Sequence, residues 1–192
     1  MISLDRPVIV EGKYDKIRLS RVISTTILTT DGFGVFRAEE KKLLLQRLAA
    51  ERGVIVLTDP DGAGLVIRNF LRGILKKEQI TNLYVPAIPG KEKRKKTPSG
   101  EGLLGVEGMN EKTLEQLFLP FAADAAPRAY EPVPRIRFYE DGFSGGENAG
   151  EKRKKLAAAF GLPGNLSSGA LLEAINLLGG LPAYESMINS WK

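Results

Sequence analysis

The chain of 192 residues contains neither cysteine nor histidine. The absence of cysteine excludes disulfides and thiolate metal sites. The absence of histidine excludes His-ligated zinc and every catalytic scheme that depends on an imidazole. Any chemistry of this chain must therefore use carboxylates, lysines, hydroxyls or a hard metal ion.

Long apolar runs are absent as well. No segment approaches the ~18 consecutive apolar residues of a membrane-spanning helix, and the N-terminal stretch MISLDRPVIVEGK has no basic leader before a long apolar segment. We therefore expect a cytoplasmic protein with no membrane partner. The composition, 43% hydrophobic and 27% charged, is that of a globular protein long enough for one ordinary domain and a small second one.

Basic residues gather in two runs, KEKRKK (91–96) and EKRKK (151–155), each with a single acid. Such patches suit a phosphate backbone, although each run alone is equally well explained as solvated surface. An anionic membrane surface is disfavoured because neither run lies on a helix with a large apolar face. The candidate phosphate-binding residues are Lys13, Arg68, Lys91, Lys93, Arg94, Lys95, Lys96, Lys152, Arg153, Lys154 and Lys155.

Strand and helix patterns alternate through the first 121 residues. Apolar and β-branched runs predict strands at 7–12, 25–32, 53–58 and 80–88. Helical periodicity predicts helices at 14–23, 38–51 and 64–75, and a further helix capped by Asn110. This order indicates an α/β fold with a parallel four-stranded sheet flanked by helices.

The character of the sequence changes near residue 122. The segment 122–135 contains three prolines and little periodicity, which indicates a linker between a domain at 1–121 and another at 136–192. Residues 135–142 have a strand-like pattern, and a glycine-rich turn and two or three short helices follow. We expect a small, mostly helical C-terminal domain that binds RNA or packs on the larger one. Tyr139 and Phe143 flank the second basic run and are candidates for stacking on bases, or for the core.

Three acids are predicted to lie where strands end. Glu11 ends the first strand, and Asp59 and Asp61 follow the third. In a parallel sheet these carboxyl ends meet at one edge, where like charges so close together demand a cation. Oxygen ligands select a hard divalent ion, Mg²⁺ or Mn²⁺.

The tetrapeptide DPDG has a second explanation, an Asx turn with a helix cap. Its combination with Glu11 in VEGK favours the metal site. Pro60 helps to hold the two aspartates in one geometry. Gly62 and Gly64 leave room for a phosphate at the start of the next helix, where backbone N–H groups favour anions.

Together, VIVEGKYDK and VIVLTDPDGAG resemble the Toprim domain, a Mg²⁺-binding catalytic module of topoisomerases, primases, recombination mediators and nucleases. With GLLGVEG (102–108) and the stretch that begins at RFYEDG, nearly the whole chain is similar to ribonuclease M5, the endonuclease that matures 5S ribosomal RNA. The resemblance implies that Glu11 is a metal ligand or general acid–base residue, and that Asp59 and Asp61 bind Mg²⁺. Glu107 matches another acid of the family, with an exposed loop acid as the alternative.

Two positions depart from the family pattern. Tyr14 stands where the family usually has an acid, which leaves Asp15 as the nearest carboxylate. Gly108 stands where a histidine is usual. Neither departure removes a core metal ligand.

The function implied is a Mg²⁺-dependent endoribonuclease acting on structured, double-helical RNA. The favoured substrate is 5S ribosomal RNA precursor, with a ribosomal protein as a possible partner. The main alternative is a non-catalytic Toprim module that binds nucleic acid in RNA processing or DNA repair. A phosphatase with a DxDG nucleophile is disfavoured because that motif normally closes the first strand of its domain, whereas here it closes the third.

Overall fold

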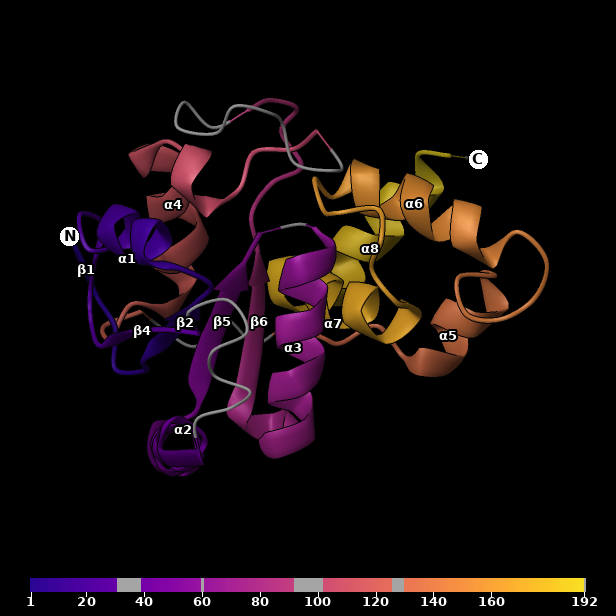
Figure 1. The fold of residues 1–192 in the computed structure, drawn as a ribbon. Coiled ribbons are helices and arrows are strands. Elements are labelled where there is room, and N and C mark those ends of the chain that lie inside the picture. The colour runs from indigo at the N-terminus through magenta and orange to yellow at the C-terminus, as the bar shows by residue number, and fades with distance from the viewer. Residues whose placement is uncertain (31–38, 60, 92–101, 126–129, 192) are drawn as a thin grey trace. The chain divides into compact units, whose positions relative to one another are not determined.

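The computed structural model describes residues 1–30, 39–59, 61–91, 102–125 and 130–191 (Figure 1). The chain divides into two compact units, Met1–Ala126 (unit 1) and Pro127–Lys192 (unit 2). The boundary between the units lies within the segment 122–135, which the sequence predicts to be a linker. Among the described helices, none is long and apolar enough to cross a membrane.

Unit 1 is built on a parallel four-stranded sheet with the order β4-β2-β5-β6 (Figure 1). The sheet strands are β2 (Val8–Val10), β4 (Ile27–Thr29), β5 (Val54–Thr58) and β6 (Ile80–Tyr84). Every residue of β2 and β5 is buried, as expected for central strands covered on both faces. The α/β fold predicted from the sequence is confirmed.

A second, two-stranded parallel sheet lies beside the first and was not predicted. It pairs β1 (Ile2–Ser3) with β3 (Ile23–Ser24). The helix expected to reach residue 23 ends earlier, because α1 spans only Lys13–Leu19. Val22, in the turn after it, and Ile23, which begins β3, are buried in the core, and β-branched residues such as these favour extended backbone over a helix.

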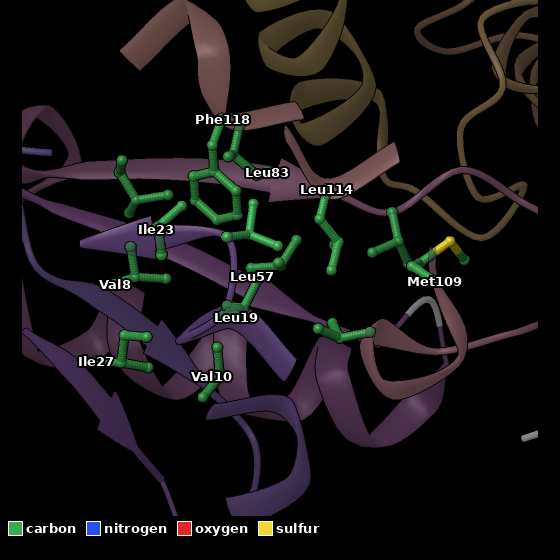
Figure 2. Close-up of a cluster of buried hydrophobic side chains, with 14 of the residues drawn as sticks. Val8, Val10, Leu19, Ile23, Ile27, Leu57, Leu83, Met109, Leu114 and Phe118 are labelled. Atoms are coloured by element: carbon green, nitrogen blue, oxygen red, sulfur yellow. The ribbon is translucent and has the colours of Figure 1, made fainter. Parts of the chain in front are cut away.

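Helices cover both faces of the main sheet. One face packs against α2 (Glu39–Arg52) and α3 (Gly62–Ile74), the other against α1 and α4 (Glu111–Phe118). Figure 2 shows the second of these two apolar clusters, in which Phe118 and Leu114 of α4 meet residues of β2, β5 and β6. Short 3₁₀ turns are η2 (Lys77–Gln79), η3 (Val106–Gly108) and η4 (Leu119–Phe121).

Helices α2 and α4 of unit 1 illustrate burial on one helix and capping on the other. On α2, Leu45 and Ala49 are buried, whereas the neighbouring Leu44 is 48% exposed. On α4, Asn110 caps the helix as predicted, since its Oδ1 accepts from the Thr113 N–H at 2.8 Å.

Unit 2 is helical in its described residues. It contains α5 (Arg135–Glu140), α6 (Ala149–Ala159), α7 (Ser168–Leu178) and α8 (Gly180–Asn189). The strand-like prediction for residues 135–142 is wrong, because α5 occupies most of this segment. Phe138 is buried, and an i,i+4 ion pair of 2.9 Å joins Arg137 to Asp141 across the end of this helix.

Three aromatic rings form the centre of unit 2. The ring centroid of Phe138 lies 5.2 Å from that of Phe143 and 6.0 Å from that of Tyr184. The Tyr184 hydroxyl donates to Asp141 Oδ2 at 2.7 Å. Burial and this hydrogen bond raise the pKa of Tyr184, so the phenol stays protonated at physiological pH. The buried aromatic cluster is thus tied through Asp141 to Arg137 of α5.

We predict that Tyr184→Phe lowers the free energy of unfolding by about 1–2 kcal/mol, because it deletes a buried hydrogen bond to a carboxylate. Denaturant titration followed by circular dichroism measures the change. Tyr139→Phe is the matched control, because Tyr139 is 61% exposed and loses only a surface hydroxyl. Equal stability of the two variants would contradict a role for the Tyr184 bond.

Candidate active site

Four carboxylates gather at the carboxyl ends of β2 and β5, two strands that pair directly. Glu11 follows β2 and Asp59 follows β5, as the sequence predicts. Asp15 lies in the first turn of α1, and Glu107 lies in η3. Asp59, Glu11 and Glu107 each raise the pKa of Asp15 electrostatically, so Asp15 interacts with all three of the other acids.

Asp15 is the most buried of these acids, with 8% of its surface exposed. Its Oδ2 accepts from the Gly12 N–H at 3.0 Å, an N-terminal capping contact of α1. Burial, then the charge of Asp59, raise its pKa to about 7 against the opposing effect of the Gly12 hydrogen bond. Sequence reasoning did not include Asp15 in the site. The sequence feature that could have indicated it is the position of Asp15, an acid about one helical turn after the strand-end Glu11.

Asp59 is held by the GVEG segment. Its Oδ1 accepts from the Val106 N–H at 2.8 Å, across 47 residues of sequence. A Cβ at Gly105 would stand 2.2 Å from Asp59 Oδ2, so only glycine lets this backbone approach the carboxylate. The same contact brings η3, and with it Glu107, to the end of β5. There the charge of Glu107 contributes to the raised pKa of Asp15. The role of Glu107 as a metal ligand stays a prediction.

Asp61 caps α3, since its Oδ1 accepts from the Gly64 N–H at 3.0 Å. This is the helix-cap alternative that DPDG allows. The space expected to admit a phosphate at Gly64 is filled by the end of β5: a Cβ there would lie 2.2 Å from the Asp59 carbonyl oxygen. Gly64 therefore serves close packing of helix against strand. A Cβ at Gly62 would meet open space.

The donor set is suited to a hard divalent cation in its chemistry, because all four groups offer carboxylate oxygens. In the part of the chain that the structure describes, no three acids are arranged as the ligands of one ion. One oxygen each of Asp59 and Asp61 is engaged by a backbone N–H. The acids thus form an interacting group and not a closed coordination shell.

Arg68 does not face solvent, and the prediction that it binds a phosphate is wrong. The residue is 4% exposed, and its guanidinium donates to Asn82 Oδ1 at 2.8 Å and to the Leu83 carbonyl at 2.6 Å. It also lies over the Tyr84 ring, 4.1 Å from the centroid. Because these partners belong to β6, Arg68 fastens α3 to the sheet.

The remaining candidate phosphate-binding residues of unit 1 divide into two groups. Lys13, which begins α1, and Lys91 are exposed. The predicted phosphate contacts of Lys93, Arg94, Lys95 and Lys96 lie outside the described residues.

In unit 2 the predicted basic run lies on α6. Lys152, Lys154 and Lys155 are exposed, although Lys154 pairs with Glu151 at 2.8 Å and the Lys155 ammonium lies 4.4 Å from the Trp191 ring centroid. Arg153 is half-buried and donates to the Phe143 carbonyl at 3.0 Å. The lysines can exchange these surface partners for phosphate more easily than Arg153 can.

The two aromatic candidates for base stacking are placed differently. Phe143 is buried in the aromatic cluster of unit 2, so its predicted alternative as a core residue is correct. Tyr139 is 61% exposed.

Comparison with known proteins shows that the chain is similar to ribonucleases M5. It is 26% identical over 178 residues to ribonuclease M5 of Staphylococcus aureus, covering 93% of each chain. It is 28% identical over 160 residues to "Ribonuclease M5 1" of Ligilactobacillus salivarius, covering 81% of this chain and 78% of the relative. The chain is thus ribonuclease M5-like over nearly its whole length, which confirms the resemblance drawn from its motifs.

A solved structure, a small TOPRIM domain protein from Bacillus stearothermophilus, matches with a TM-score of 0.42 and 23% identity over 62% of this chain and 90% of that one. No family model matches the chain.

We predict that Asp15 makes the protein less stable as the pH rises. The folded-state pKa, about 7, lies above the ordinary value of 3.8, so the folded protein binds the proton more tightly than the unfolded chain. This stabilisation is complete below pH 4 and is lost as the pH rises through 7, by at most about 4 kcal/mol. Asp15→Asn keeps an acceptor for Gly12 and removes the charge, so it should be increasingly stabilising between pH 4 and 8. Denaturant titration across this range measures the difference, and a constant difference would contradict it.

We predict that Arg68→Ala lowers the free energy of unfolding by about 3–5 kcal/mol, because buried carbonyl and amide acceptors lose their donor. Arg72→Ala, on the same helix, is the control, since Arg72 is exposed and should cost less than about 1 kcal/mol. Thermal unfolding measures both. An unchanged melting temperature for Arg68→Ala would show that its contacts do not stabilise unit 1.

Proposed function

We propose that this ribonuclease M5-like chain is an endoribonuclease that depends on a divalent cation and cleaves structured RNA. The observation that carries the proposal is the placement of Glu11 and Asp59 at the carboxyl ends of the paired strands β2 and β5, with the turn of Glu107 held to Asp59 by the Val106 N–H. Such a group of like charges is stabilised by a cation. The similarity of the chain to ribonucleases M5 supports the reaction class.

Glu11, Asp15, Asp59 and Glu107 would hold Mg²⁺ or Mn²⁺, with Asp61 as the further ligand that the sequence predicts. When bound, the cation supplies an activated water and neutralises charge on the leaving oxygen of a phosphodiester. The N–H groups of Gly12 and Val106 orient the carboxylates of Asp15 and Asp59. Without the cation, burial and the neighbouring acids raise the pKa of Asp15 to about 7, so binding of the cation near neutral pH would release its proton. No cysteine or histidine nucleophile is needed.

The substrate we propose is double-helical RNA, with 5S ribosomal RNA precursor as the favoured example and a ribosomal protein as a partner that presents it. Double-stranded RNA is recognised mostly through its shape, phosphates and 2′-hydroxyls, for which exposed lysines are adequate. Lys13 and Lys91 of unit 1 and the lysines of α6 in unit 2 are exposed candidates. We further propose a cytoplasmic catalytic domain at 1–121 joined by a linker at 122–135 to an RNA-binding or packing domain at 136–192.

One alternative keeps the same fold without catalysis. The carboxylates of Asp59 and Asp61 accept backbone hydrogen bonds that any structural aspartate can make. In this alternative Asp59 and Asp61 serve only the fold, and the Toprim-like module binds nucleic acid without cutting it. The two functions differ in one measurable respect, cleavage of RNA in the presence of a divalent cation.

We predict that the wild-type chain cleaves structured RNA with Mg²⁺ or Mn²⁺ and not with EDTA, and that Asp59→Asn lowers the rate about 100-fold or more. The substitution removes a negative charge but leaves Oδ1 to accept from Val106, so the fold should persist. Glu51→Gln is the matched control, because Glu51 is an exposed acid of α2 that pairs only weakly with Arg47. Gel analysis of a panel of structured RNAs and duplex DNA measures cleavage.

Cleavage that persists in EDTA, or in Asp59→Asn at the wild-type rate, would rule out the proposed mechanism. RNA binding by the wild type without cleavage in either cation would support the non-catalytic alternative.

A further inference from the structure

Arg18 of α1 joins two segments that lie 91 residues apart in the sequence. Its Nε and Nη2 both donate to the Met109 carbonyl, at 2.9 and 2.7 Å. Its Nη1 contacts Glu111 Oε1 at 3.4 Å, near the start of α4. The two short bonds to one carbonyl use the planar fork of a guanidinium, which a lysine ammonium cannot reproduce.

The carbonyl that Arg18 binds directly follows η3, the turn that carries Glu107. The other end of η3 is held by the hydrogen bond from Val106 to Asp59. Val106 and Met109 are themselves buried in the core of unit 1. The turn is therefore held at one end by Asp59, directly after β5, and at the other end by Arg18 of α1.

Arg18 and Asp15 lie three positions apart on α1, so they share one side of the helix. That side faces η3, because Arg18 reaches Met109 from it. The contact of Arg18 with η3 thus keeps the turn of Glu107 against the same helix that carries Asp15. Arg18 itself contacts none of these acids directly in the bonds described, and acts on the turn through the Met109 carbonyl.

We infer that Arg18 is a positioning residue: by clamping η3 against α1, it sets the spacing of Glu107 from Asp15 and Asp59 and thereby the affinity for a divalent cation. The inference rests on the proposed function, because it assumes that these acids bind the ion. Groups that orient the ligands of a metal from outside typically change its affinity 10- to 100-fold when they are removed.

The first experiment measures Mn²⁺ binding without RNA, by electron paramagnetic resonance of the free ion, at a temperature at which circular dichroism shows every variant folded. Arg18→Gln should raise the Kd for Mn²⁺ about 10-fold or more. Arg18→Lys, which can donate to Met109 through one N–H at a time, should give an intermediate value. Glu111→Gln is the matched control: it removes the ion pair but leaves both bonds to Met109, so its Kd should stay within about twofold of wild type.

The second readout separates positioning from general loss of structure. For Arg18→Gln, the Mg²⁺ concentration that gives half-maximal RNA cleavage should rise by a similar factor, while the rate at saturating Mg²⁺ recovers toward the wild-type value. A merely structural role would instead lower the rate at every Mg²⁺ concentration and leave the half-saturation point unchanged.

The outcomes distinguish this inference from the proposed function. If the wild type binds Mn²⁺ and Arg18→Gln binds it equally well, the positioning role is overturned and the endoribonuclease proposal stands. If the wild type binds no Mn²⁺, both are overturned. Should Arg18→Gln fail to fold, Arg18→Lys decides, since a wild-type Kd in that variant would also overturn the positioning role.

Discussion

The hydrogen bond from the Val106 N–H to Asp59 determines how the candidate site is assembled. It joins the end of a central strand to a turn 47 residues further along the chain. The bond requires a glycine at position 105, because any side chain there would occupy the space of the Asp59 carboxylate. Through this contact, Glu107 becomes a neighbour of acids to which it has no local connection in the sequence.

The group of acids is also a source of instability for unit 1. Asp15 is buried, and its three acidic neighbours oppose its ionisation. A protein selected for stability alone would not place four carboxylates together, since each charge raises the free energy of the others. The N–H groups of Gly12 and Val106 hold the carboxylates of Asp15 and Asp59 against this repulsion. Arg18 holds the backbone that follows the turn of Glu107. Strongly perturbed pKa values of this kind cluster at functional sites.

The basic residues show how differently one charge can be used. The guanidinium of Arg68 is enclosed by an amide, a main-chain carbonyl and an aromatic ring, which replace the water that a buried cation loses. The lysines of α6 keep their ammonium groups at the surface, in contacts that are screened by salt and easily exchanged. Arg68 therefore serves the fold, whereas the lysines remain available for a phosphate backbone.

The sequence by itself determined the four strands of the main sheet and the helices between them, the parallel arrangement of that sheet and the strand-end positions of Glu11 and Asp59. These features follow from local periodicity and turn residues, which act over a few neighbouring positions. It also predicted the cap at Asn110 and allowed the cap at Asp61. Only the tertiary structure decided that Asp15 joins the acids, that Arg68 is buried and that Arg135–Glu140 is a helix. The environment of each of these residues is set by segments distant in sequence. Local sequence patterns do not indicate which of those segments a side chain will contact.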